Sequence, residues 1–183
     1  NYEVPQNRER VIVLGSKSKI NLPKKVNRKV TAGQALGDLP FQFDSDSKFF
    51  TESMDRYVAN YERASSCINP RDLYLDRPAR TLTCRNLAGA TGDMHRVRLK
   101  DGRRRRITVR EAARLQSFPD WFEFFGTETH QFNQIGNAVA PNFAYHLASN
   151  IKNHLITGGS RQYNVTENDQ YLLFDDAAIY QSR

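Results

Sequence analysis

The chain has 183 residues, a formal net charge of +7 and 39% hydrophobic residues, which fits one ordinary domain or two small lobes. No apolar run reaches the ~18 residues of a membrane span and no signal peptide is visible, so a cytoplasmic protein without a membrane partner is expected. The two cysteines, Cys67 and Cys84, are too few for a disulfide framework and lack metal-ligand spacing, so no metal site is predicted.

The N-terminal residues combine an alternating polar pattern with an apolar run. Gln6, Arg8 and Arg10 alternate at period two, so an extended chain projects all three from one face. Residues 11–14 are apolar at every position, as in a strand covered on both sides, and a buried strand is predicted over 10–14. Guanidinium groups suit planar acceptors such as a phosphate or a base edge. From the spacing alone, two surface arginines at a strand entrance are an equally good interpretation.

Local signals predict several short elements in the next part of the chain. Thr31 and Gln34 have the spacing of a capping box, so a short helix is expected after Thr31. Residues 49–61 favour a helix and residues 78–83 a strand. Residues 86–92 are small and favour an ordinary loop over a phosphate-binding one.

A basic hairpin is predicted over residues 94–107, with its turn at Asp101-Gly102. Between Arg96 and Arg106 lie seven basic residues and one acid, which favours a polyanionic partner. Alternate side chains of the first strand are basic, so they are expected to share one face of the hairpin. The alternative is a charged face that is simply solvated.

A helix with a clear start follows the hairpin. Thr108 and Glu111 have the spacing of a second capping box, and Pro119 stops the helix because the residue before a proline leaves the helical region. Residues 121–125 are rich in aromatic side chains, for which a place in the core is preferred over a platform that stacks on a base. His130 is predicted to lie in a loop and is not assigned as a ligand.

A longer helix is predicted towards the C-terminus. Gly136 and Asn137 are placed just before it, and Pro141 suits its first turn, where the missing N–H costs nothing. Apolar residues recur at four-residue steps from Val139 to Leu155, so this helix is expected to bury one long stripe.

Three segments, in this order and with these gaps, resemble the last conserved blocks of the DNA (cytosine-5) methyltransferases. The segments are Tyr2-Glu-Val-Pro-Gln-Asn-Arg-Glu-Arg10, Arg110-Glu-Ala-Ala-Arg-Leu-Gln-Ser-Phe-Pro119 and Gln134-Ile-Gly-Asn-Ala-Val139. Any one of them alone is a moderate signal, whereas three in family order are a strong one. The resemblance covers residues 2 to about 150.

The resemblance implies an α/β fold, or α+β for the isolated piece. It would comprise the terminal strand and closing helix of a Rossmann-like methyltransferase domain, with a small, partly β target-recognition lobe. The expected parts are the end of the catalytic domain (1–15), the recognition lobe (16–120), the helix that returns to the catalytic domain (121–156) and a tail (157–183).

The implied function is transfer of a methyl group from S-adenosylmethionine to C5 of a cytosine flipped out of duplex DNA, in an enzyme of the kind paired with restriction enzymes. By resemblance, Arg8 and Arg10 lie at the catalytic pocket and help to hold the target nucleotide. Gly136, Asn137 and Val139 are assigned to the border of the methyl donor, and the N-terminus of the following helix suits the donor's carboxylate.

Double-stranded DNA is the partner that the resemblance implies, and most basic side chains are expected to contact phosphate rather than bases. The residues assigned to DNA contact are Arg85, Arg96, Arg98, Lys100, Arg103, Arg104 and Arg105.

Parts of the family pattern are absent from the sequence. Neither Cys67 nor Cys84 follows a proline, as the family's nucleophile does, and there is no Gly-rich strand-to-helix turn for the cofactor. The chain is therefore expected to be the C-terminal part of a longer enzyme, inactive alone and dependent on an N-terminal catalytic part in cis or in trans. The alternatives are the recognition subunit of a split methyltransferase and a non-catalytic DNA-binding module.

Overall fold

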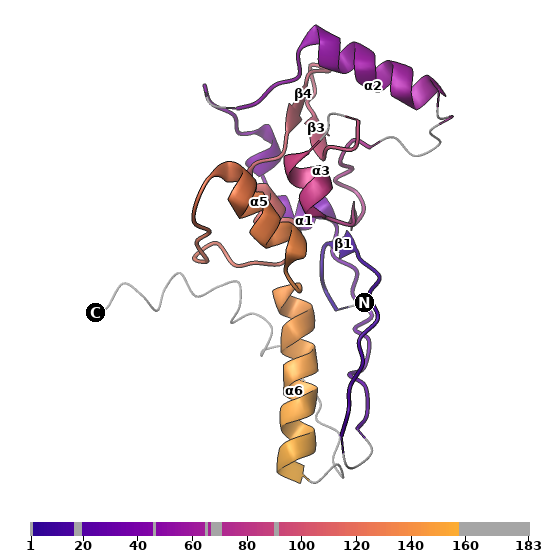
Figure 1. The fold of residues 1–183 in the computed structure, drawn as a ribbon, viewed down its shortest axis with the longest axis vertical. Helices are drawn as coiled ribbons and strands as arrows, with labels where there is room; N and C mark the ends of the chain where they lie inside the picture. Colours follow the sequence, from indigo (N-terminus) through magenta and orange to yellow (C-terminus); the bar gives the residue numbers. More distant parts are fainter. Residues whose placement is uncertain are drawn as a thin grey trace, which may run out of the picture.

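The computed structural model describes residues 2–16, 20–45, 47–64, 66, 71–89 and 92–157. Cys67 and the tail beyond residue 157 lie outside the described residues, so the expectations for them stay predictions. Figure 1 shows a head that contains most of the helices and strands, with one long helix, α6 (Pro141–Thr157), leading away from it. None of the helices in the described part of the chain is both long and apolar enough to cross a lipid bilayer.

Short helices surround two small sheets. In chain order the elements are β1 (Gln6–Asn7), α1 (Ala32–Leu36), the 3-10 helix η1 (Leu39–Phe41), α2 (Glu52–Ala64), β2 (Ala79–Arg80), α3 (Cys84–Ala88), β3 (Arg96–Arg98), β4 (Arg104–Arg106), α4 (Val109–Leu115), α5 (Glu128–Asn137) and α6. Strands β1 and β2 pair in parallel, whereas β3 and β4 pair antiparallel. This mixture of helices and small sheets agrees with a piece of an α/β methyltransferase fold.

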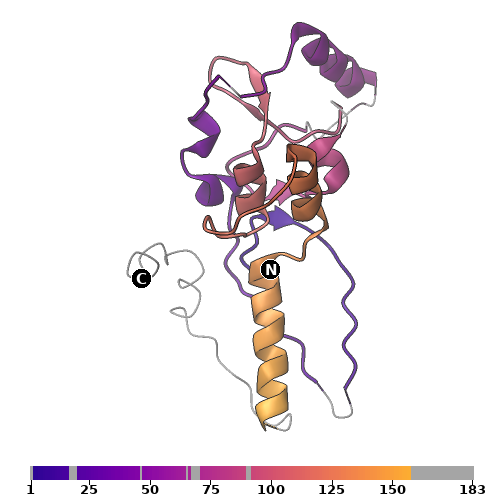
Figure 2. The same cartoon turned by 60° about the vertical axis from the view of Figure 1, so that its left-hand side comes forward.

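The N-terminal segment and α6 lie side by side. The rings of Tyr2 and Phe143 are 5.1 Å apart, and Ser16 Oγ lies 3.1 Å from His154 Nε2, so contacts are made near both ends of the helix. Helix α2 lies at the opposite end of the head from α6 in both views (Figure 1 and Figure 2).

Both predicted capping boxes are confirmed. The Thr31 hydroxyl accepts a hydrogen bond from the Gln34 backbone N–H at 3.1 Å, and the Gln34 side chain accepts one from the Thr31 N–H at 2.9 Å. Thr108 and Glu111 make the same reciprocal pair, at 3.1 and 2.7 Å. Each box satisfies backbone donors that a helix start leaves open, so α1 and α4 begin where the sequence predicts.

The predicted hairpin is confirmed as well. Arg96 pairs with Arg106 and Arg98 with Arg104, and the turn contains Gly102 at a φ of 87°. A glycine adopts this left-handed conformation without steric cost, which explains why the turn forms at Asp101-Gly102.

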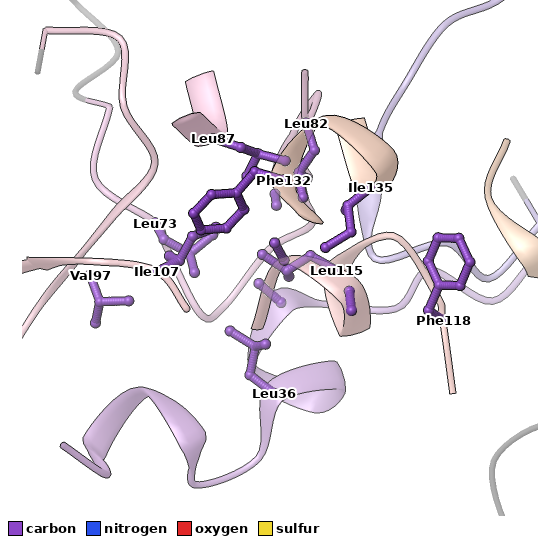
Figure 3. Packing of buried hydrophobic residues seen from close by; sticks show 14 of the residues in the cluster. Leu36, Leu73, Leu82, Leu87, Val97, Ile107, Leu115, Phe118, Phe132 and Ile135 are labelled. Atoms are coloured by element: carbon purple, nitrogen blue, oxygen red, sulfur yellow. The ribbon is translucent and has the colours of Figure 1, made fainter. Parts of the chain in front are cut away.

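The core of the head is formed by side chains from α1, α3, α4 and α5, from strands β2 and β3, and from the segments that connect them. Figure 3 shows Phe132 and Ile135 of α5 among leucines from α1, α3 and α4, with Val97 of β3 at one side. The labelled core residues are Leu36, Leu73, Leu82, Leu87, Val97, Ile107, Leu115, Phe118, Phe132 and Ile135. Burial of these apolar side chains fixes α4 and α5, on which the second and third motif segments lie.

Two expectations about apolar burial are wrong for the chain as described. Residues 10–14 form no strand, and Val11 and Val13 are 91% and 88% exposed. Leu155 is 75% exposed, and the buried side chains that α6 presents are polar, among them Asn142 and His146. An apolar pattern indicates a face that packs against other residues, but the described residues do not pack against these side chains.

Three local expectations are wrong too. His130 lies within α5 rather than in a loop, because Thr127 caps a helix there and accepts from His130 N at 3.3 Å. The segment expected to be a loop from Asn86 begins inside α3, which has its own capping box at Thr83. The aromatic run at 121–125 is only partly in the core.

Trp121 shows most clearly that the aromatic run is not a core segment. Its side chain is 61% exposed and that of Phe125 is 72% exposed, whereas Phe124 packs against the core, with its ring centroid 5.0 Å from that of Phe118. Aromatic content alone does not say which side of a segment faces inwards.

His95 gives the fold an expected sensitivity to acid. It is fully buried, and burial together with the charge of Arg80 lowers the pKa of His95 to about 3. An unfolded histidine has a pKa of about 6.5, so below that pH the unfolded chain binds a proton that the folded chain excludes. The free energy of unfolding should therefore fall, by up to about 1.4 kcal/mol per pH unit, as the pH drops from 6.5 towards 3.

Urea denaturation of the wild type and of His95→Gln across this range measures the effect. The variant should lack this part of the pH dependence, and an unchanged slope in the variant would show that His95 is protonated in the folded state.

Candidate functional site

The three motif segments meet around the fully buried side chain of Gln116. Its amide nitrogen donates to the backbone carbonyls of Ile135 at 3.0 Å and Ala138 at 2.8 Å, and its oxygen accepts a hydrogen bond from Gln6 Nε2. The Gln6 oxygen accepts in turn from the backbone N–H of Leu82 at 3.0 Å. Two buried amides thus connect β1, the end of α4, the end of α5 and the segment before α3, and we call this connection the motif junction.

Arg8 completes the motif junction from the other end of β1. Its guanidinium donates to the carbonyl of Leu82, to that of Gly136 at 3.1 Å and to that of Ala138 at 3.4 Å. Burial lowers the pKa of Arg8 below its ordinary value, and the positive charge of Arg10 lowers it further, while Cys84 acts in the opposite direction. Arg8 is thus a partly buried cation whose hydrogen bonds in the described chain go to neutral carbonyls.

Arg10 is placed differently from Arg8. Its side chain is exposed, and its Nη1 donates to the adjacent carbonyl of Glu9 at 2.6 Å. No ion pair joins Arg10 to a carboxylate among the described residues. Of the two arginines predicted for the catalytic pocket, Arg10 therefore leaves its charge exposed, whereas Arg8 donates to the surrounding backbone.

Gly136 is explained by close packing of α5 against α3. A Cβ atom built on Gly136 would lie 2.3 Å from the backbone nitrogen of Cys84, so any side chain here would push the two helices apart. Gly136 and Asn137 are the last residues of α5, and three residues separate this helix from the start of α6 at Pro141. The expected position of Pro141 in the first turn of α6 is confirmed, but the segment before it is a helix end rather than an open turn.

Asn137 and Val139 lie at the surface beside this packed pair of helices. Asn137 is exposed, and its Oδ1 accepts a hydrogen bond from Cys84 Sγ at 3.2 Å. Val139 is 58% exposed in the extended link between α5 and α6. The structure therefore brings all three residues predicted to border the cofactor to one helix end, with Gly136 inside and the other two outside.

Arg96 faces the interior rather than a DNA backbone. Its side chain is 0% exposed and forms ion pairs with Asp72 at 2.6 Å and with Glu62 of α2 at 2.8 Å. Burial raises the pKa of Asp72, but hydrogen bonds from Arg96 and Arg98 lower it by more, so its net pKa lies below the ordinary value. The charge of Arg96 is fully used within the protein, and its assignment to DNA contact is withdrawn.

Arg105 is also an interior residue. Its guanidinium makes a two-pronged ion pair with Glu111, at 2.7 and 2.9 Å, and both side chains are 1% exposed. It also donates to the carbonyls of Leu39 and Pro40, at 3.2 and 3.0 Å. Since Glu111 in turn caps α4, Arg105 joins the hairpin to the start of that helix, and its assignment to DNA contact is withdrawn too.

Four of the seven basic residues assigned to DNA contact are exposed: Arg85, Arg98, Lys100 and Arg103. Arg98 is held by Asp72 at 2.8 Å, and Arg103 by Asp101 at 2.7 Å. Arg104 is 13% exposed and lies 2.8 Å from Asp55 of α2, so it contributes little charge to the surface.

Gln6 and Gln116 are the residues of the motif junction that sequence reasoning does not single out as site residues. Each of them belongs to a motif segment, which is a signal in the sequence. An uncharged amide, however, does not by itself indicate a catalytic or binding role. Their part is to fix the backbone on which Arg10, Asn137 and Val139 stand.

Comparison with known proteins places the whole site in one family. The family model described as C-5 cytosine-specific DNA methylase matches residues 1–153. The type II methyltransferase M.AplI of Arthrospira platensis is 54% identical over 163 residues, which are 88% of this chain and 47% of that protein. The type II methyltransferase M.MthTI of Methanothermobacter thermautotrophicus is 31% identical over 178 residues, which are 84% of this chain and 54% of that protein.

A shorter match reaches a plant enzyme. DNA (cytosine-5)-methyltransferase 2 of Arabidopsis thaliana is 51% identical over 57 residues, which are 31% of this chain and 4% of that protein. The chain spans about half the length of the two type II methyltransferases named above, at 47% and 54%. The match over residues 1–153 includes all three motif segments and the residues that join them, and the chain belongs to the C-5 cytosine-specific DNA methylase family.

Proposed function

We propose that this chain is the DNA-recognising, C-terminal part of a restriction-modification methyltransferase that moves a methyl group from S-adenosylmethionine to C5 of a flipped cytosine. The observation that carries the proposal is the motif junction, in which Gln6, Arg8 and Gln116 hold three family motifs together. The family membership supports the reaction, and the missing Pro-Cys pair supports a catalytic part elsewhere.

The proposed division of the chain follows its charge and exposure. Residues 16–120 form the recognition lobe, and residues 1–15 with 121–156 form the edge that joins the catalytic part. Val11, Val13 and Leu155 are exposed apolar side chains along this edge, in the region where the N-terminal segment and α6 lie together. We expect the catalytic part to cover them, because exposed apolar side chains that gather along one edge mark an interaction site.

The residues at the end of α5 fit a place at the border of the cofactor. S-adenosylmethionine supplies the methyl group, and its charged amino-acid end needs polar partners. The Asn137 amide nitrogen makes no hydrogen bond to the described residues and is a suitable donor, while Val139 offers an apolar contact. Gly136 has an indirect part in this site. It lets α3 and α5 pack closely, because a side chain at this position would collide with the backbone of Cys84.

Arg10 is proposed to act on the extruded nucleotide. Its exposed guanidinium has no carboxylate partner in the described chain, so it can donate to a phosphate or to a base oxygen. The motif junction beside it keeps the backbone of β1 fixed and reduces the loss of conformational freedom when the nucleotide binds.

DNA binding by the full chain tests the proposal through its salt dependence. Each cation that neutralises a phosphate lowers the slope of log K against log salt by about 0.9. Replacing Arg98, Lys100 and Arg103 with alanine should therefore make the slope for a mixed-sequence duplex less negative by about 2–3.

Arg77→Ala is the control, since Arg77 is 60% exposed, is paired with the adjacent Asp76 and does not belong to the hairpin. Fluorescence anisotropy between low and physiological salt gives the slopes. Equal slopes for the triple variant and the wild type would mean that the hairpin tip is a solvated surface.

A further inference from the structure

Helix α2 covers part of the basic outer face of the hairpin, over Arg96 and Arg104, whereas Arg98 remains 51% exposed. Arg96, Arg98 and Arg104 all extend from this face, on which the sequence predicts DNA contact. Helix α2 lies against it, with Asp55 2.8 Å from Arg104 and Glu62 2.8 Å from Arg96. A duplex that approaches this side of the head therefore meets α2 before it meets the strands.

The outward face of α2 carries a row of polar side chains. Val58, at 0% exposed, marks the inward side of the helix. At 3.6 residues per turn, Arg56, Asn60 and Arg63 fall within roughly 60° of one another on the opposite side. All three are exposed, and none makes a side-chain hydrogen bond or ion pair with another residue in the described part of the chain.

The two sides of α2 have separate roles. Its inward acids hold the helix on the hairpin, so the outward side chains are not required to keep it in place. Arginine and asparagine are among the residues that recognise base edges, arginine by two hydrogen bonds to guanine and asparagine by two to adenine.

The dimensions of the row suit the major groove. From Arg56 to Arg63 the helix rises about 10.5 Å, at 1.5 Å per residue. Three base-pair steps rise about 10 Å, at 3.4 Å per step along each strand. The major groove, about 12 Å wide, admits an α-helix.

We propose that α2 is a base-reading helix: it enters the major groove of duplex DNA, with Arg56 and Arg63 reading guanines and Asn60 reading an adenine between them. The inference rests on the proposed function, because it needs the lobe to recognise duplex DNA. It adds three specificity-determining residues that lie outside the hairpin, and it assigns the exposed hairpin residues to phosphate contact.

Selection from a pool of duplexes with a short randomised centre tests the proposal on the full chain. The wild type should enrich a sequence that contains both guanine and adenine. Asn60→Ala should lose the preference for adenine at one position, and Arg56→Ala and Arg63→Ala should each lose a preference for guanine, by roughly 5- to 100-fold. Alanine is the best helix former, so these variants keep α2, which circular dichroism and the thermal midpoint verify.

The control is the double variant Arg77→Ala/Lys152→Ala. Like Arg56→Ala/Arg63→Ala it removes two positive charges, but from exposed positions outside α2. It should keep the wild-type preference. Base reading by α2 is overturned if its variants enrich the wild-type sequence, or if they lose affinity evenly for all sequences, as phosphate contacts would. In either case duplex binding by the wild type leaves the proposed function standing, whereas a wild-type chain that binds no duplex overturns both.

Discussion

Arg105→Ala is expected to destabilise the head by roughly 3–5 kcal/mol, because it leaves the carboxylate of Glu111 buried without a cation. Both side chains of this pair are 1% exposed, and the arginine also satisfies two backbone carbonyls before α2. A loss of this size is comparable to the whole stability of a marginal domain, roughly 5–15 kcal/mol. The variant should therefore unfold at a much lower urea concentration or fail to accumulate.

Arg103→Ala is the matched control, two residues away in the same hairpin. Arg103 is 54% exposed and pairs with an exposed aspartate, so its loss should change the free energy of unfolding by about 1 kcal/mol or less. Urea denaturation followed by circular dichroism compares the two. If both variants have the same midpoint, the Arg105–Glu111 pair does not stabilise the fold.

The difference between buried Arg105 and exposed Arg103 determines which substitutions can test DNA binding by the hairpin. A variant that replaces Arg103, Arg104 and Arg105 together would lose DNA binding through unfolding as well as through lost charge. Substitutions restricted to the exposed residues avoid that ambiguity, which is why the salt experiment leaves Arg105 in place.

Arg10→Ala in the active enzyme is expected to lower kcat on the order of 10²-fold or more, while the Kd for duplex DNA changes little. Arg10 is exposed and without a carboxylate partner in the described chain, whereas the proposed duplex contacts lie in the recognition lobe. An interaction made with the extruded nucleotide strengthens near the transition state, so its loss appears in turnover rather than in ground-state binding.

Arg8→Ala should instead lower the stability of the fold. It removes hydrogen bonds to the carbonyls of Leu82, Gly136 and Ala138, so the thermal midpoint should fall and affinity and turnover should fall with it. Measuring kcat, duplex Kd and the thermal midpoint on both variants separates the two roles. An Arg10→Ala enzyme with a lowered midpoint but near-normal kcat in its folded fraction would contradict a place for Arg10 at the nucleotide.

Local signals in the sequence predict the local structure well. The capping boxes at Thr31 and Thr108, the helix within 49–61 and the turn at Gly102 depend on residues within a few positions of one another. Each local arrangement satisfies backbone groups or permits a backbone angle, so tertiary contacts are not needed to specify it.

Burial was harder to predict, because it depends on what lies opposite. The apolar run at 11–14 and the stripe ending at Leu155 have the composition of covered faces, yet the described chain leaves Val11, Val13 and Leu155 exposed. Periodicity identifies such a face but not the partner that covers it.

The largest difference between sequence and structure concerns charge. Counting basic residues predicts a polyanion-binding hairpin, but the count does not show which arginines meet carboxylates in the fold. Arg96 meets Asp72, 24 residues earlier, and Glu62, 34 residues earlier, and both distances in sequence are too long for a local pattern. Pairing at this range follows from tertiary structure and determines which cations stay exposed at the surface.

The central proposal, that this chain directs methyl transfer to cytosine, is tested most directly by supplying the proposed catalytic part. The portion of the Arthrospira platensis methyltransferase that this chain does not match can be fused to the chain, with the intact relative as positive control and the chain alone as negative control. Bisulfite sequencing of duplex DNA incubated with S-adenosylmethionine should show C5-methylated cytosines in a fixed sequence context for the fusion and none for the chain alone. Methylation by the chain alone, or a folded fusion that methylates nothing while the intact relative is active, would contradict the account.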